Sequence, residues 1–223
     1  MKRTFALLGL AVLAAMPASA ADRGFYWGLD LGQYSYGLDQ NEIDGQLVGA
    51  LDAFGLSILD GTSETSEDGF SYGITFGYQI LRFLAVEAAY LDLGDAEYKA
   101  NLDVTDGTAV APLNATLSAD SSGPALSVLG ILPIWSSGWE VYGRAGMYFS
   151  NGDGTVRLSS DGVSDSVSDS ANSESFLWGV GAGYSSGPWT LRLEYQQYMD
   201  VGDEDTTGEV DIDRITIGAV YHF

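Results

Sequence analysis

The residues best suited to chemistry are charged side chains at alternate positions in otherwise apolar segments. Glu140 and Arg144 are an even number of residues apart in the segment 139–149, and Arg192 and Glu194 are two residues apart in the segment 189–198. Residues two apart point to the same face of a β-strand. Opposite charges on one face can form a network of ion pairs or, if a path remains open, a leak for protons, ions or water.

Acyl-transfer chemistry would need a base beside a serine nucleophile. The one histidine, His222, comes next to last in the chain, and we expect no serine to partner it. No histidine-based acyl-transfer site can be assembled on this reasoning. We therefore expect neither an enzyme nor a cofactor.

Carboxylates gather most densely in the segment 200–209. Carboxylate oxygens suit Ca²⁺ or Mg²⁺, but the spacing is not that of an EF-hand loop. The alternative is a solvated acidic loop that stays mobile, so this is a weak candidate for cation binding and no defined metal site is expected. Its members are Asp200, Asp203, Glu204, Asp205 and Glu209.

The first 20 residues have the features of a secretory signal peptide. Lys2 and Arg3 precede an apolar stretch over 5–15, and Ala18-Ser19-Ala20 fits a small-residue cleavage site. The apolar stretch is too short for a spanning helix. We expect residues 1–20 to be removed near Ala20 and residues 21–223 to form one domain.

Charge and cysteine content restrict the function. The chain has 31 acidic and nine basic residues, and Lys2 and Arg3 belong to the predicted signal peptide, which leaves a net charge of −24. Such a charge excludes nucleic acid as a partner. The chain has no cysteine, so a closed sheet or a core must supply stability without disulfides.

Eight segments alternate apolar and polar residues with the period of a β-strand. The fourth is apolar on both faces and is the least distinctive. The segments are 25–36, 70–79, 83–92, 124–134, 139–149, 175–184, 189–198 and 213–223. An all-β fold follows, an eight-stranded antiparallel up-and-down barrel.

The connections alternate between short and long, which is typical of an outer-membrane barrel with short periplasmic turns and long extracellular loops. The short ones are 80–82, 135–138 and 185–188, and the long ones are 37–69, 93–123, 150–174 and 199–212. Most acidic residues lie in the long connections, against Lys99 and Arg157 alone. The first also has Leu47, Leu51, Phe54 and Ile58 at helical spacing, which favours a short helix that caps or packs on the barrel mouth over one that recognises a partner.

Aromatic residues distinguish a membrane barrel from a soluble sandwich or lipocalin-type barrel. They fall near both ends of the segments, as two interfacial belts would, and the face between them carries no charge. The opposite face then lines the lumen and holds seven charged residues, which would form a structural plug or, as the alternative, a gated leak. They are Asp30, Glu87, Glu140, Arg144, Arg192, Glu194 and Arg214.

Several motifs resemble the OmpA-type transmembrane barrel and the wider group of small outer-membrane barrel and opacity proteins, over nearly the whole mature chain. They are Phe76-Gly77-Tyr78-Gln79 followed by Val86-Glu87 and Tyr90, Val141-Tyr142-Gly143-Arg144-Ala145-Gly146, Leu191-Arg192-Leu193-Glu194-Tyr195-Gln196 followed by Val201-Gly202-Asp203, and the closing Ile217-Gly218-Ala219-Val220-Tyr221-His222-Phe223.

The resemblance implies a location in the outer membrane, in contact with its lipid and lipopolysaccharide. It also implies that Thr216, Gly218, Tyr221 and Phe223 form the signal read by the barrel-assembly machinery, with periplasmic chaperones as further transient partners. Because the chain stops at Phe223, we expect no peptidoglycan-binding domain. Leu129 stands where some relatives place a lumenal lysine, which argues against a gating switch carried over from them.

Three functions remain open from the sequence. The first is a structural barrel with a plugged, salt-bridged lumen that supports envelope integrity. The second is a narrow channel for ions or small solutes. The third is a surface adhesin or ligand-binding protein that acts through the acidic loops.

Overall fold

The computed structural model describes residues 24–38, 40–135, 137–160, 163–203 and 208–223. The predicted signal peptide lies outside the described residues. Those described form one helix and nine strands, which are β1 (Gly24–Tyr36), α1 (Gln40–Ala53), β2 (Ser57–Ser66), β3 (Asp68–Leu81), β4 (Leu84–Thr105), β5 (Val110–Pro133), β6 (Trp139–Ser160), β7 (Val163–Ser186), β8 (Trp189–Asp203) and β9 (Gly208–His222).

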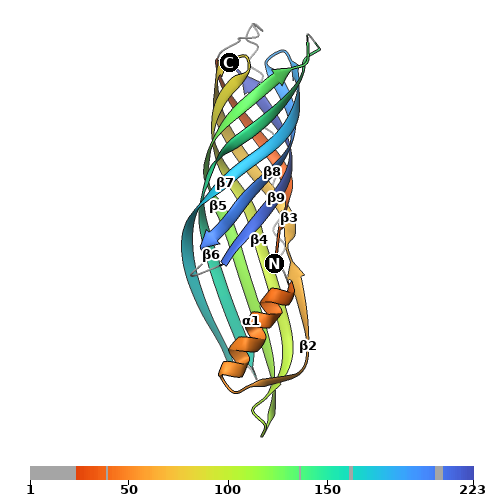
Figure 1. Cartoon of the computed structure of the whole chain (residues 1–223), viewed down its shortest axis with the longest axis vertical. Coiled ribbons are helices and arrows are strands. Elements are labelled where there is room, and N and C mark those ends of the chain that lie inside the picture. The colour runs from red at the N-terminus through yellow and green to blue at the C-terminus, as the bar shows by residue number, and fades with distance from the viewer. Residues whose placement is uncertain (1–23, 39, 136, 161–162, 204–207) are drawn as a thin grey trace.

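All strands except β2 join in a closed antiparallel ring, shown in Figure 1. Each strand pairs with the next along the chain, and β1 closes the ring because it pairs with both β3 and β9. Leu29 of β1 lies opposite Ile74 on one side and Ala219 on the other. The predicted eight-stranded up-and-down barrel is therefore confirmed.

The alternation along β5 explains why its sequence was apolar on both faces. Leu126 and Val128 point outward and are about half exposed, whereas Leu129 and Ile131 point inward and are buried. The inward pair packs with Tyr26 and other lumenal residues in a small apolar cluster. Here the barrel wall is apolar both on its outer surface and on its inner surface.

Glycines on the inner face make room for large tyrosines. A Cβ on Gly77 would lie 2.1 Å from Cζ of Tyr26, and one on Gly181 would lie 2.5 Å from Cζ of Tyr142. Neither distance is compatible with a side chain. The lumen of an eight-stranded barrel is just wide enough to be filled by side chains, and these glycines set where the rings fit.

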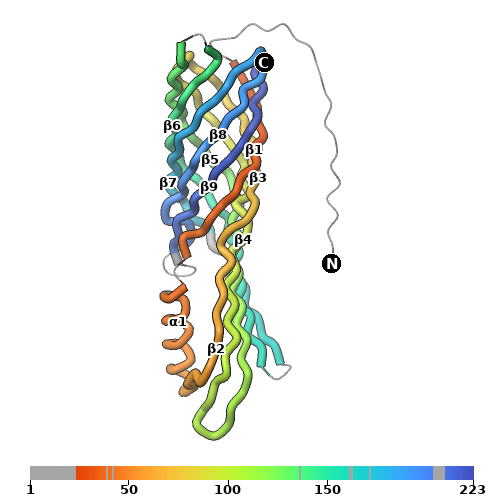
Figure 2. The backbone as a smooth tube through the Cα atoms, turned by 90° about the vertical axis from the view of Figure 1, so that its right-hand side faces the viewer, coloured from red at the N-terminus to blue at the C-terminus, as the bar shows by residue number. Residues whose placement is uncertain are grey.

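Four strands continue well beyond the barrel and form an extension, shown in the lower half of Figure 2. We use this name for α1, β2 and the parts of β4 to β7 outside the ring. Val104 of β4 still pairs with Ala111 of β5, and Val156 of β6 with Val167 of β7. The connections 93–123 and 150–174, expected to be loops, are therefore mostly paired strand.

The helix in the first long connection covers one face of the extension. Ile43 and Leu47 of α1 pack on a cluster formed by Tyr98, Ala100 and Ala115. This agrees with the packing role expected for the helix, although it rests on the extension rather than on the barrel mouth. The helix also ends earlier than its apolar spacing indicated.

The end of α1 has a local cause. The amide of Phe54 donates to the carbonyl of Leu51, and Gly55 adopts a φ of +73°, a conformation that glycine adopts easily at a helix C-terminus. Phe54 is thereby exposed in a turn, and Ile58 belongs to β2.

The extension is an open sheet whose outer edges are β2 and β7. Aspartates bond to backbone amides along these edges. The amides of Ser166 and Ser170 on β7 each donate to the carboxylate of the preceding residue, Asp165 and Asp169, at 2.9 Å. On β2 the amide of Gly61 donates in the same way to Asp60.

Aromatic rings are paired on the outside of the barrel near the short turns. Ring centroids lie 4.8 Å apart for Phe25 and Tyr78, and 5.0 Å apart for Trp189 and Tyr221. Within the described part of the chain, no helix has the length and apolarity that a membrane crossing requires.

Candidate functional site: the lumenal charge network

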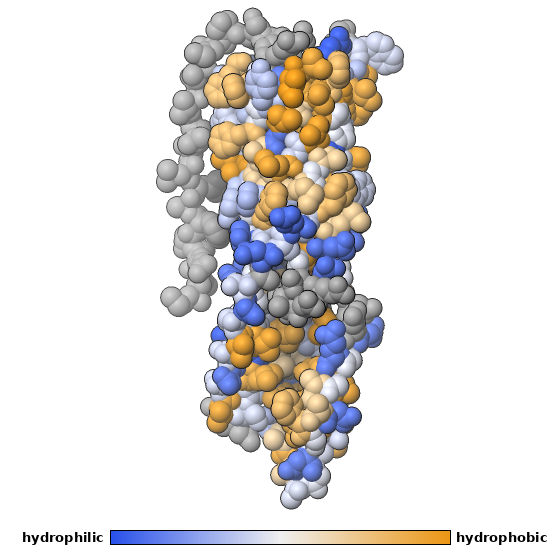
Figure 3. Space-filling model, turned by 60° about the vertical axis from the view of Figure 1, so that its left-hand side comes forward, coloured by the Kyte–Doolittle hydropathy of each residue, from blue (hydrophilic) through white to orange (hydrophobic). Residues whose placement is uncertain are grey.

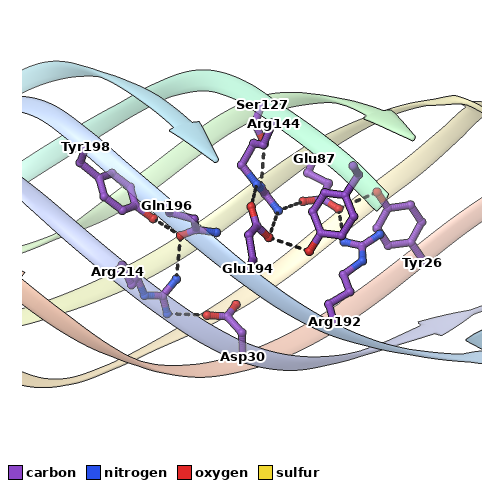
Figure 4. A network of polar contacts seen from close by, with 11 residues as sticks. Tyr26, Asp30, Glu87, Ser127, Arg144, Arg192, Glu194, Gln196, Tyr198 and Arg214 are labelled. Carbon is purple, nitrogen blue, oxygen red and sulfur yellow. Dashed lines mark hydrogen bonds and ion pairs between the residues drawn. The ribbon is translucent and has the colours of Figure 1, made fainter. Parts of the chain in front are cut away.

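Glu87 on β4 is the centre of a buried network, shown in Figure 4. Its Oε1 lies 2.6 Å from Nη1 of Arg192, and its Oε2 lies 2.7 Å from Nη2 of Arg144. The hydroxyl of Tyr26 donates to Oε1 at 2.7 Å. One carboxylate therefore binds two guanidinium groups from strands that are not its neighbours in the sheet.

Arg144 on β6 joins Glu87 to the second carboxylate of the network, that of Glu194. Its Nε lies 2.5 Å from Oε1 of Glu194, and its Nη2 lies 3.1 Å from Oε2. The remaining Nη1 donates to Oγ of Ser127 at 2.9 Å, and the hydroxyl of Tyr142 donates to Glu194 at 3.0 Å. This fork geometry is the strong form of a charge-assisted hydrogen bond.

Arg192 lies between two aromatic rings. Its Cζ is 5.4 Å from the ring centroid of Tyr26 and 5.2 Å from that of Tyr142. Both distances fall within the range of cation–π contact. The two tyrosines hold the guanidinium from either side while their hydroxyls bind the two carboxylates.

A second group lies beside the first. Arg214 on β9 forms an ion pair with Asp30, and its Nε donates to Oγ of Ser71 at 2.7 Å. Its Nη1 donates to Oε1 of Gln196 at 3.2 Å, and the same oxygen accepts from the hydroxyl of Tyr198 at 2.5 Å.

The two groups are electrically balanced. The first joins two carboxylates to two guanidinium groups, and the second joins one of each. Balance matters because an unpaired buried charge costs far more than a paired one. Apolar clusters lie on both sides of the charged layer, one around Tyr26, Leu129 and Ile131 and the other around Leu93 and Tyr148.

Little space remains between these side chains. A cavity of about 30 Å³ is lined by Asp30, Arg144, Glu194 and neighbouring residues. That volume accommodates on the order of one or two waters.

Of the seven charged residues predicted to face the lumen, six meet in these two groups. Glu140 does not: it lies beside Gly183, where a Cβ would approach its Oε1 to 2.8 Å, and it forms no ion pair with the arginines of the described lumen. Sequence reasoning did not name the uncharged partners. They are Tyr26, Ser71, Ser127, Gln196 and Tyr198. The sequence could have indicated them, because each occupies a strand position whose side chain points into the lumen.

The proposed assembly signal forms the end of β9. Thr216 is buried and faces the lumen, and Gly218 lies opposite Asp30 and Arg192. Tyr221 packs its ring on Trp189 and on Phe223. Reading of this segment by the assembly machinery stays a prediction.

His222 has a hydroxyl partner that the sequence did not suggest. Its Nε2 lies 3.1 Å from Oγ1 of Thr190, which in turn lies 2.8 Å from Oγ of Ser185. Thr190 is buried at 2% exposure, so its hydroxyl is not accessible to a substrate. The imidazole also packs on the ring of Tyr26 at 5.1 Å.

The structure describes only part of the acidic segment 200–209, the weak candidate for cation binding. Glu204 and Asp205 lie outside the described residues. Asp200 has a φ of +55°, and its amide donates to the carboxylate of Asp211 at 3.1 Å. Among described residues, no three acidic or histidine side chains are arranged to hold a metal ion.

With the barrel and its lumen described, comparison with known proteins identifies the family. A model of the OmpA-like transmembrane domain matches residues 20–223. The chain belongs to the OmpA-like transmembrane domain family. This OmpA-like barrel therefore lies in the bacterial outer membrane.

One relative and one solved structure show how far the likeness of this OmpA-like chain goes. It is 30% identical to outer membrane protein A of Yersinia pseudotuberculosis serotype I (strain IP32953) over 220 residues, which are 98% of this chain and 53% of that protein. The chain thus spans about half the length of that relative. The crystal structure of Neisserial surface protein A is similar with a TM-score of 0.50 and 16% identity, covering 93% of this chain and 100% of that one, and shows the fold alone.

Proposed function

We propose that this protein is a structural outer-membrane barrel whose lumen is closed to ions. The observation that carries the proposal is the buried network in which Glu87 and Glu194 bind Arg144 and Arg192 across the lumen. An ion that passed this layer would have to separate buried charge pairs, at a cost of several kcal/mol for each pair. The small residual cavity supports the same conclusion.

Conductance of the purified protein in planar bilayers tests this proposal. The wild-type protein, shown to be folded by its heat-modifiable mobility, should give no steady openings. An Arg192→Ala variant is run beside it because it opens the layer between Tyr26 and Tyr142. Steady openings of the wild type that change in the variant would instead assign a channel.

The proposed function involves no catalysis. The one histidine contacts a threonine hydroxyl that is buried, and six of the seven charged residues of the lumen are bound to one another. Neither arrangement leaves a reactive group facing a substrate.

A second function, surface recognition, is favoured by one feature of the extension. Val156 of β6 lies opposite Val167 of β7, and Leu158 and Val163 lie on the same face of these two strands. Val156, Leu158, Val163 and Val167 are 43%, 42%, 74% and 68% exposed. Figure 3 shows hydrophobic residues on the extension, separated from those of the barrel by hydrophilic residues. Contiguous apolar surface outside the membrane is typical of an interaction site.

The acidic surroundings of this face favour a cationic partner. Asp165 and Asp169 alternate with the two valines on β7. Cells that display the protein should adhere to polylysine-coated surfaces, and a Val163→Ser, Val167→Ser variant should adhere less. Equal adhesion of both, at equal surface levels, would remove the support for recognition at this face.

A further inference from the structure

Two glycines on the outside of the barrel are not explained by packing within it. Gly130 of β5 and Gly143 of β6 lie opposite each other and point outward. A Cβ on Gly130 would meet no atom within 4 Å, and one on Gly143 would lie 4.0 Å from the nearest, the carbonyl oxygen of Gly179. Glycine weakens a strand and often marks a place where another molecule approaches closely.

These glycines form one end of a furrow on the lipid-facing surface. The furrow is an open depression with a volume of about 630 Å³. Two cross-strand rows line it from β5 to β9. One row is Gly130, Gly143, Val180, Tyr195 and Ile215, and the other includes Leu132, Val141, Ala182 and Leu193.

The length and direction of the furrow fit one acyl chain. Five neighbouring strands at about 4.8 Å spacing give a length of about 19 Å, compared with about 15 Å for half of the hydrocarbon core. Leu132 is next to the periplasmic end of β5 at Pro133, whereas Ile215 is well inside β9, which ends at His222. The furrow therefore rises from the periplasmic boundary toward the middle of the membrane.

The periplasmic end of the furrow lies beside a side chain whose chemistry suits a lipid headgroup. The amide of Ile131 donates to the carbonyl of Phe83 at 2.9 Å, which holds the β3–β4 turn and its exposed Arg82 next to Leu132. Arg82 is the one charged residue among the described residues of the three short turns. An exposed guanidinium there is suited to a phosphate group.

Two tryptophans lie near the same end of the furrow. Trp135, in the turn between β5 and β6, is 94% exposed and adopts a φ of +49°. Trp139 follows at the start of β6 and is also exposed. Tryptophan is among the side chains most typical of the membrane interface, so its presence here fits a headgroup region at this end of the furrow.

We propose that the furrow is a binding site for a phospholipid of the periplasmic leaflet. One acyl chain lies along Gly130, Gly143 and Val180, and the phosphate pairs with Arg82. This site does not depend on whether the lumen conducts, since it lies on the opposite face of the strands.

Photo-crosslinking tests the site. The protein is reconstituted in phosphatidylethanolamine and phosphatidylglycerol vesicles that contain a trace of phospholipid with a diazirine on one acyl chain, and crosslinked residues are mapped by mass spectrometry. We expect crosslinks to concentrate on Leu132, Val141 and Val180. A Gly130→Leu, Gly143→Leu variant should reduce them about tenfold, because its side chains fill the furrow.

Matched variants separate the site from general effects on the barrel. Ala88→Leu places a leucine on the outside of β4, away from the furrow, and should leave the crosslinks unchanged. Arg82→Gln alters no strand and should reduce crosslinking at Leu132 several-fold even if the filled variant does not fold. Crosslinks spread evenly around the barrel would overturn the proposal.

Discussion

Glu87 on β4 and Arg192 on β8 are 105 residues apart in the sequence, and their side chains meet in the lumen with Oε1 and Nη1 2.6 Å apart. The two strands are not neighbours in the sheet, so the ion pair crosses the barrel. It links opposite walls in addition to the hydrogen bonds that link each strand to the next.

Neutralising Glu87 should destabilise the barrel strongly. Glu87→Gln leaves the guanidinium groups of Arg144 and Arg192 beside a neutral amide, and breaking a buried pair costs about 3–5 kcal/mol. Urea unfolding in lipid vesicles, followed by tryptophan fluorescence, measures the change. Glu140→Gln is the matched control, because Glu140 lies in the lumen outside the network and should change stability by less than about 1 kcal/mol. Equal losses for the two variants would contradict the assignment of the network.

A methyl group on Gly77 should prevent the barrel from closing correctly. Its Cβ would lie 2.1 Å from Cζ of Tyr26, a ring that is buried and held by Glu87 and Arg192. Gly77→Ala should therefore lose the heat-modifiable band of the folded protein on electrophoresis. Gly130→Ala, on the outside of the barrel, should keep that band. A normally folded Gly77→Ala protein would show that the ring of Tyr26 can shift.

The hydroxyl of Tyr98 should hold α1 against the extension. It donates to the carboxylate of Asp44 on α1, and burial followed by this hydrogen bond raises the pKa of Tyr98 to about 12. Tyr98→Phe removes the bond at a cost of about 1 kcal/mol. Hydrogen exchange of the α1 amides should quicken about fivefold, whereas the exchange of barrel strands stays the same. If both change together, the effect is global and the contact is not a local attachment.

The rim of the barrel should lose stability as the pH rises from about 4. Asp120 of β5 lies opposite Asp153 of β6, and burial followed by the charge of Asp153 raises the pKa of Asp120. The unfolded chain ionises near pH 4 and the folded protein only at higher pH. Folding therefore becomes less favourable between these two values.

Protection factors of amides near Asp120, measured by hydrogen exchange between pH 4 and 7, report this effect. They should fall with pH in the wild type and stay level in Asp120→Asn. Asp52→Asn, which removes an exposed carboxylate of α1, should retain the wild-type dependence. A pH dependence that persists in Asp120→Asn would assign it to another group.

The alternation of apolar and polar residues was enough to predict the barrel strands and to predict that their charged side chains point into the lumen. It predicted the positions of Arg144, Arg192 and Glu194 because parity depends only on counting residues along a strand. It did not show that Glu140 stays outside the network, because this depends on how far each side chain reaches across the lumen. The Thr190 partner of His222 depends on the pairing of β8 with β9, which no local sequence feature reveals.

The extension was missed for a related reason. The segment Val163-Ser164-Asp165-Ser166-Val167 consists of small polar residues and isolated valines, and its composition is typical of a loop. It is a strand because it continues the pairing of β6 with β7 beyond the barrel, with Val156 opposite Val167. Such pairing is a property of two distant segments together, so neither indicates it alone.

The aspartates that bond to the amides of Gly61, Ser166 and Ser170 affect how neighbouring copies of the protein meet in a crowded membrane. An outer membrane confines many copies of a protein to one plane, at one height and in one orientation, so the open edges of neighbouring extensions face each other. Unpaired strand edges in that arrangement would invite the copies to join into continuous sheets. Carboxylates that already occupy edge donors, and that repel the same carboxylates on the next copy, keep neighbouring molecules separate without any change to the barrel.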